Sequence, residues 1–120
     1  MKNKRALLIV ESTGKAFDRF AEVLKSPAKS RHKGYIVLSF PSFEVLGKII
    51  TGTRLELLSA IRSHKPRSIQ ELARITKRDF KNVYQDVKIL AEYGLIELRE
   101  SGARKASHPV AKFTELLIAA

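Results

Sequence analysis

The sequence predicts an α+β fold, with a small β-α-β-α extension followed by three short helices and a two-stranded hairpin. Three observations carry this prediction. Helix-capping patterns recur between residues 53 and 82, a strand-turn-strand pattern follows them, and β-prone and helical stretches alternate in the first half of the chain. We therefore predict an extension over residues 1–51, a helix-and-hairpin domain over 52–113, and an apolar tail over 114–120.

The composition favours a cytoplasmic protein with an anionic partner. The 120 residues are 44% hydrophobic, and no apolar run approaches the roughly 20 residues that a membrane span needs. The chain has no cysteine, which excludes disulfides and cysteine-based zinc sites, and its three histidines lack metal-ligand spacing. A net charge of +11 favours nucleic acid, although ribosomal proteins and basic toxins share this bias. We expect no metal, no cofactor and no membrane association.

The extension is predicted from two β-prone runs and two helical stretches. Residues 5–10 and 34–40 are rich in branched and aromatic side chains, and residues 13–24 place apolar side chains at helical spacing. A proline ends the second run, and Ser42 is suited to cap a short helix that ends near residue 50. The basic cluster over residues 25–33 favours a solvated loop over a DNA-binding arm.

Nothing in the extension indicates catalysis. Gly14-Lys15 lacks the upstream glycine and the following Ser or Thr of a phosphate-binding loop, so we interpret it as a helix start. We expect that the chain is not an enzyme.

Capping boxes begin the next two helices. Thr53 with Glu56 fits the pattern in which a hydroxyl caps the helix and a carboxylate reaches back. Apolar side chains continue this helix to about His64, ahead of a proline. Ser68 with Glu71 repeats the pattern and starts a second helix of about two turns.

A third helix is predicted over residues 80–93, close behind the second. Asp79 is its cap candidate, with Asn82 three residues on, and Gly94 suits a left-handed helix end. The apolar face comprises Phe80, Val83, Val87, Leu90 and Ala91. The remaining surface is polar and can meet phosphates and base edges in a DNA major groove. Most amphipathic helices have an ordinary solvated face, but the capped helix and tight link before this one favour a helix-turn-helix.

A hairpin is predicted after the third helix. Residues 95–100 read as one strand, Ser101-Gly102 as the turn, and residues 106–113 as the returning strand, where Pro109 suggests an exposed edge. Basic side chains at the tip suit a wing that meets the DNA backbone or minor groove, although a plain surface hairpin is the alternative. The order of elements is that of a winged helix-turn-helix, with a three-helix core and a β-hairpin wing.

Four segments carry a family likeness, namely residues 53–61 (TRLELLSAI), 66–73 (PRSIQELA), 78–90 (RDFKNVYQDVKIL) and 94–98 (GLIEL). Together they resemble the MarR-like predicted transcriptional regulators of archaea and bacteria, over about half of the chain. Gly52 departs from the pattern, because such proteins often carry proline there. The resemblance implies a winged-helix fold, duplex DNA binding through the helix at 80–93, and homodimers. It is compatible with an antitoxin-type autoregulator and a cognate toxin-like partner.

The residues expected to bind DNA are Arg67, Ser68, Arg78, Lys81, Asn82, Tyr84, Gln85, Lys88, Arg104 and Lys105. The first two would anchor a phosphate at a helix terminus, Arg78 would hold backbone at the groove edge, and the last two would dock the wing. The other five would enter the major groove. Asp86 is expected to pair with a neighbouring Arg or Lys and not to contact a base.

The β-α-β segment and the apolar tail are the expected dimer surfaces. Two alternative functions remain open. One is a winged helix used only for protein contacts, and the other is a small basic nuclease or toxin, for which no catalytic cluster is visible at short range.

Overall fold

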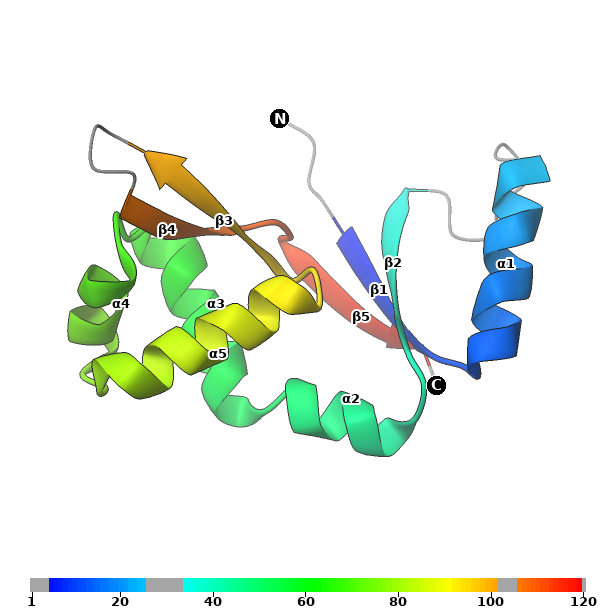
Figure 1. Ribbon diagram of the computed structural model, residues 1–120, viewed down its shortest axis with the longest axis horizontal. Helices are drawn as coiled ribbons and strands as arrows, with labels where there is room; N and C mark the ends of the chain where they lie inside the picture. The colour runs from blue at the N-terminus through cyan, green and yellow to red at the C-terminus, as the bar shows by residue number, and fades with distance from the viewer. Residues whose placement is uncertain (1–4, 26–33, 102–105, 120) are drawn as a thin grey trace. The chain divides into compact units, whose positions relative to one another are not determined.

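The computed structural model describes residues 5–25, 34–101 and 106–119. In these ranges the protein is α+β, with five helices and five strands (Figure 1). In chain order they are β1 (Arg5–Val10), α1 (Thr13–Lys25), β2 (Tyr35–Phe40), α2 (Phe43–Ile49), α3 (Gly52–His64), α4 (Ile69–Thr76), α5 (Phe80–Glu92), β3 (Ile96–Ser101), β4 (Ala106–Ala111) and β5 (Glu115–Ala119). No helix in the described ranges is long and apolar enough to cross a membrane.

The chain forms two compact units. The first comprises Met1–Lys48 with Phe113–Ala120, and the second comprises Ile49–Lys112. The C-terminal segment therefore belongs with the extension that precedes the second unit, and it forms a strand there where an apolar tail was expected.

A three-stranded parallel sheet forms the first unit. β1 is the central strand, with β2 on one side and β5 on the other (Figure 1). The register pairs Leu8 of β1 with Leu38 and Ile118. α1 provides the crossover between β1 and β2 that parallel neighbours require.

The elements predicted for residues 5–50 are confirmed to within one or two residues. Ser42 caps α2 as expected, since its hydroxyl accepts a hydrogen bond from the Val45 N–H at 3.1 Å. Ser12 does the same for α1, accepting from the Lys15 N–H at 3.2 Å. Residues 26–33, which hold most of the predicted basic loop, lie outside the described residues.

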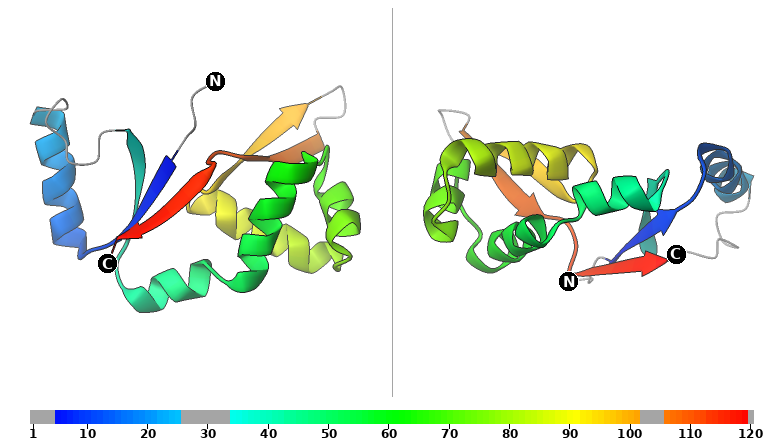
Figure 2. Two further views of the ribbon diagram at one scale, coloured as in Figure 1. Left: turned by 180° about the vertical axis from the view of Figure 1, so that it is seen from behind. Right: turned by 90° about the horizontal axis from the view of Figure 1, so that it is seen from below.

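The second unit comprises α3, α4, α5 and the antiparallel hairpin of β3 and β4 (Figure 2). All three helices and the hairpin contribute to its core, whose most buried members are Leu57, Ile61, Pro66, Leu72, Val83, Val87, Leu90, Leu95 and Pro109. The burial of Pro109 shows that its ring packs inward, even though β4 lies in a sheet of only two strands.

The predicted Thr53–Glu56 capping box is wrong, because α3 begins earlier. The Thr51 hydroxyl accepts a hydrogen bond from the Arg54 N–H at 3.2 Å, and Thr53 lies inside the first turn. The earlier start adds helical hydrogen bonds, beginning with the Leu55 N–H to the Thr51 carbonyl at 2.9 Å. Thr51 and Thr53 can both cap a helix, and the helix that begins after Thr51 is the more stable because it is longer.

α4 and α5 begin at the predicted residues, but their capping hydrogen bonds differ from the prediction. Ser68 caps α4, but the Glu71 carboxylate accepts from the Arg67 N–H at 3.3 Å and not from that of Ser68. Asp79 occupies the N-cap position of α5 without a side-chain cap bond. Phe80, predicted to lie in the core, is 45% exposed because it lies at the edge of the apolar face.

Candidate nucleic-acid interface

Helix α5 buries one face and exposes the other. Val83, Val87 and Leu90 are fully buried. The side chains predicted for the major groove are all exposed, namely Lys81, Asn82, Tyr84, Gln85 and Lys88. The structure therefore brings five of the predicted site residues onto one surface of one helix.

Aromatic rings and a cation form a row along one side of this surface. The rings of Phe80 and Tyr84 stack, with centroids 5.9 Å apart and an interplanar angle of 25°. The Lys88 ammonium lies 5.6 Å from the Tyr84 centroid, within cation–π range. Phe80 is 45% exposed and Tyr84 is 41% exposed, so the outer edges of both rings are available to a ligand.

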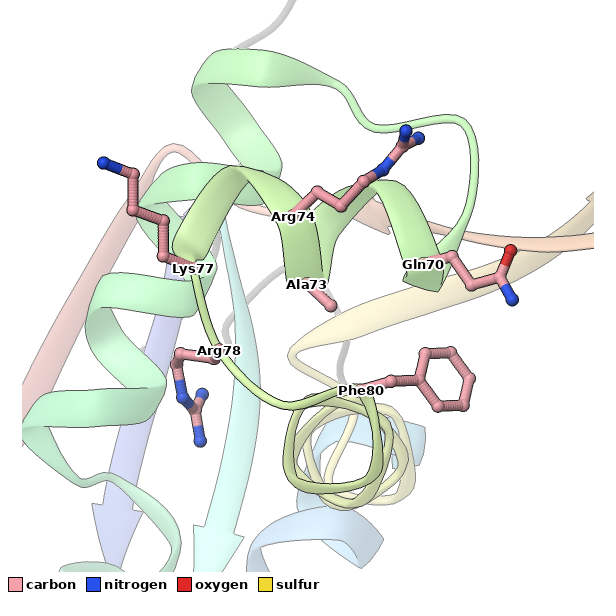
Figure 3. A pocket seen from close by; sticks show the side chains of 6 residues that line it. All are labelled: Gln70, Ala73, Arg74, Lys77, Arg78 and Phe80. Atoms are coloured by element: carbon pink, nitrogen blue, oxygen red, sulfur yellow. The ribbon is translucent and has the colours of Figure 1, made fainter.

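An open groove of about 590 Å³ lies beside α4 and the start of α5 (Figure 3). Its lining consists of Gln70, Ala73, Arg74, Lys77, Arg78 and Phe80. Arg74 and Lys77 extend from α4 in different directions, and Arg78 points away from both (Figure 3). Arg74 and Lys77 do not converge on one point, as a site for a small anion would require. Charge spread in this way suits an extended polyanion.

Sequence reasoning missed Gln70, Arg74 and Lys77. Their spacing of four and then three residues places all three on one side of α4, and it could have been found from the sequence. Lys77 also ends α4 in the left-handed conformation, with φ of 55°.

Arg78, which was predicted to hold the DNA backbone, makes an internal ion pair. Its Nη2 lies 2.9 Å from Oδ2 of Asp86, and its Nη1 is buried with no hydrogen-bond partner among the described residues. Asp86 also accepts from Nε of Arg54 at 3.0 Å. The prediction that Asp86 pairs with neighbouring arginines is confirmed.

The start of α4 already carries its own cap. The Ser68 hydroxyl accepts from the Glu71 N–H at 3.0 Å, and the Glu71 carboxylate lies at the same helix terminus. This negative charge opposes a phosphate at the terminus. Arg67 is exposed, and the half-buried Ser68 hydroxyl accepts the cap hydrogen bond while keeping its own proton for donation.

The hairpin contributes less to the described surface. Arg104 and Lys105, predicted to dock the wing, lie outside the described residues. On β3, the Arg99 guanidinium donates to both carboxylate oxygens of Glu97, at 3.1 and 3.3 Å. This hydrogen bonding, together with the charge of Glu97, raises the pKa of Arg99.

Among the residues that the structure describes, a set of exposed cations makes no ion pair, comprising Arg67, Arg74, Lys77, Lys81 and Lys88. They span the solvent faces of α4 and α5 and the loop before α4. The same described ranges hold no group of three or more His, Asp or Glu side chains that could bind a metal ion. The surface can therefore offer cations, amides and aromatic edges.

Comparison with protein families identifies the family of this chain. The sequence model of the HVO_A0114 family matches residues 49–118, which is more than half of the chain and includes all of the second unit. Comparison with curated proteins and with solved structures finds no match.

Proposed function

Given that the chain belongs to the HVO_A0114 family, we propose that its second unit is a winged helix-turn-helix domain that binds double-stranded DNA sequence-specifically in transcriptional regulation. In this proposal α4 and α5 form the helix-turn-helix, α5 is the recognition helix, and β3 with β4 is the wing. The resemblance of residues 53–98 to MarR-like regulators supports the same assignment.

The observation that carries the proposal is the unpaired cationic surface over α4 and α5. Arg74, Lys77, Lys81 and Lys88 are exposed and make no ion pair with any described carboxylate. A phosphate backbone would supply the missing charge and release counterions. Asn82 and Gln85 lie on the same helix face as Lys81 and provide the amides that contact adenine edges.

In this proposal the residues of α4 contact phosphates and the residues of α5 contact bases. Arg74 and Lys77 project outward from α4 and suit phosphates on one strand, which hold the protein in register. The exposed edges of Phe80 and Tyr84 suit apolar contact with thymine methyl groups in the major groove. Specificity would then come from α5 and affinity largely from α4.

A salt series tests the proposal directly. The purified protein is titrated with the DNA upstream of its own gene and with a scrambled duplex of equal length and composition. We expect binding to the native duplex to persist at salt concentrations that release the scrambled one. Equal, salt-sensitive binding to both would indicate a non-specific role. Absence of binding to either would favour a protein-contact function.

Two kinds of variant distinguish residues that recognise bases from residues that contact phosphates. Gln85→Ala should lose about 1–3 kcal/mol of discrimination between the two duplexes. Arg74→Ala and Lys77→Ala should weaken both duplexes alike and lower the slope of log K against log salt by about one each. Lys15→Ala on α1 makes the same charge change in the first unit and should leave both quantities unchanged. If Gln85→Ala left discrimination intact, α5 would not be the recognition helix.

A further inference from the structure

Helix α1 presents large apolar side chains to solvent. Phe17 is 73% exposed, Phe20 58% and Leu24 67%, and no residue of the helix is buried. No other described element of the first unit lies along the outer side of α1 (Figures 1 and 2). Three such side chains in one stripe exceed the scattered apolar exposure that is normal for a protein surface.

The spacing of the stripe is that of a helix-pairing seam. Thr13, Phe17, Phe20 and Leu24 are separated by four, three and four residues, which is the 3.5-residue repeat of paired helices. The flanking positions are Gly14, Ala16, Ala21 and Val23, which are small or apolar and uncharged. A second helix can therefore approach closely, with no flanking charge to desolvate.

We propose that α1 is a homodimerisation surface on which α1 of a second copy packs antiparallel. The sequence of the seam is self-complementary about the midpoint between Asp18 and Arg19. Antiparallel pairing about that point sets Phe17 against Phe20 of the second copy, and Thr13 against Leu24 of the second copy. A two-fold interface requires such matching of a surface with itself, and an unrelated partner does not.

Charge does not oppose this pairing. The charged side chains of α1 lie outside the seam and its flanking positions, namely Lys15, Asp18, Arg19, Glu22 and Lys25, so the pairing removes none of them from water. Within the copy, Arg19 already pairs with Glu11 at 2.8 Å, so α1 adds little to the repulsion between two strongly basic chains.

The available area indicates a concentration-dependent dimer. A fully buried aromatic side chain removes roughly 150–250 Å² from water, so the exposed parts of this stripe offer on the order of 350 Å² per copy. The pair would bury about 700 Å², roughly half of a standard interface. Dissociation on dilution is therefore part of the proposal.

Sedimentation equilibrium of the full-length protein without DNA, over a concentration series, tests the proposal independently of DNA binding. We expect a monomer–dimer equilibrium, and Phe20→Glu and Leu24→Glu should each raise the dimer Kd about 30-fold or more. Both side chains are exposed, so folding is retained, which circular dichroism checks. Lys15→Glu introduces the same side chain at an exposed position off the seam of the same helix, so it is the control and should change the Kd only slightly. A monomer at every concentration, or equal effects of all three variants, would overturn the proposal.

Cysteine cross-linking tests the orientation, because the chain has no native cysteine. Thr13→Cys and Leu24→Cys are oxidised separately and as a mixture. Antiparallel packing predicts a disulfide-linked dimer only in the mixture, since like positions would lie about 16 Å apart at 1.5 Å per residue. Efficient cross-linking of either variant alone would indicate parallel packing and overturn the proposed geometry.

Discussion

Asp86 holds two arginines from different parts of the second unit. One carboxylate oxygen accepts from Arg54 of α3 and the other from Arg78, in the link before α5. Arg54 also donates to the Ile49 carbonyl at 3.2 Å, so the cluster reaches back to the start of the unit. These contacts fix α5 against α3 and thereby set the orientation of the exposed face of α5.

Asp86→Asn should reduce the free energy of unfolding by about 1–3 kcal/mol, because it leaves two partly buried guanidinium groups without a counter-charge. Urea denaturation measures the loss. Arg78→Ala and the double variant complete a thermodynamic cycle, and a coupling energy near zero would show that the pair contributes nothing.

Lys77 combines a strained backbone with a place on the cationic surface. Its φ of 55° lies in the left-handed region, which costs a side-chain-bearing residue about 1 kcal/mol relative to glycine. Lys65, which ends α3, has φ of 47° and lines no part of the groove. The two lysines therefore share a backbone conformation and differ in whether they line the groove, so comparing them separates backbone strain from contact with an anion.

Lys77→Gly should therefore raise the free energy of unfolding by about 0.5–1 kcal/mol while weakening DNA binding. Lys65→Gly should give the same gain in stability with unchanged binding, and it serves as the control. Thermal unfolding and duplex titration of both variants provide the comparison. Unchanged DNA binding by Lys77→Gly would remove this residue from the proposed interface.

At the scale of elements, the starts of α1, α2, α3 and α4 are each capped by a single hydroxyl group. Thr51 and Thr53 are both threonines ahead of a helical run, but only Thr51 accepts the first-turn N–H of Arg54. The competition between them depends on how many further residues can become helical, which a local pattern does not report.

Thr51→Ala should cost about 1 kcal/mol of unfolding free energy, whereas Thr53→Ala should be neutral within about 0.5 kcal/mol. Chemical denaturation of the two variants measures the difference. Equal losses, or a larger loss at Thr53, would contradict the observed start of α3.

The types and order of the elements from β1 to β4 were predictable because each is encoded locally. The apolar period of α5, the serine caps of α2 and α4, and Gly94 at φ 81° all lie within a few residues of the structure that they determine. The pairing of β5 with β1 was not predictable in this way, because it joins segments at opposite ends of the sequence. The internal engagement of Arg78 likewise depends on packing that the linear pattern does not contain.

At the scale of the whole molecule, β1 depends on strands that come before and after the second unit. Its neighbour β2 comes before the second unit, and its other neighbour β5 comes after Lys112, where that unit ends. Removing β5 leaves β1 with one hydrogen-bonded neighbour in place of two.

Ending the chain at Thr114 should lower the opening free energy of β1 amides by about 2–4 kcal/mol, from several lost strand hydrogen bonds at roughly 1 kcal/mol each. Amide hydrogen exchange measures this. The amides of α5 should keep their protection, because this helix belongs to the other unit. Equal loss of protection in α5 would show that the two units do not unfold separately.

The pairing of β1 with β5 also has a kinetic consequence. During synthesis β1 emerges first, and its partner β5 emerges only after the entire second unit. The contacts within the second unit are less separated in sequence, so this unit can fold while β1 still lacks a neighbour. Once it has folded, the flexible chain between β1 and β5 is shorter, which lowers the entropy lost when the loop closes. The candidate DNA-binding surface is thus assembled before the sheet that carries α1 is complete.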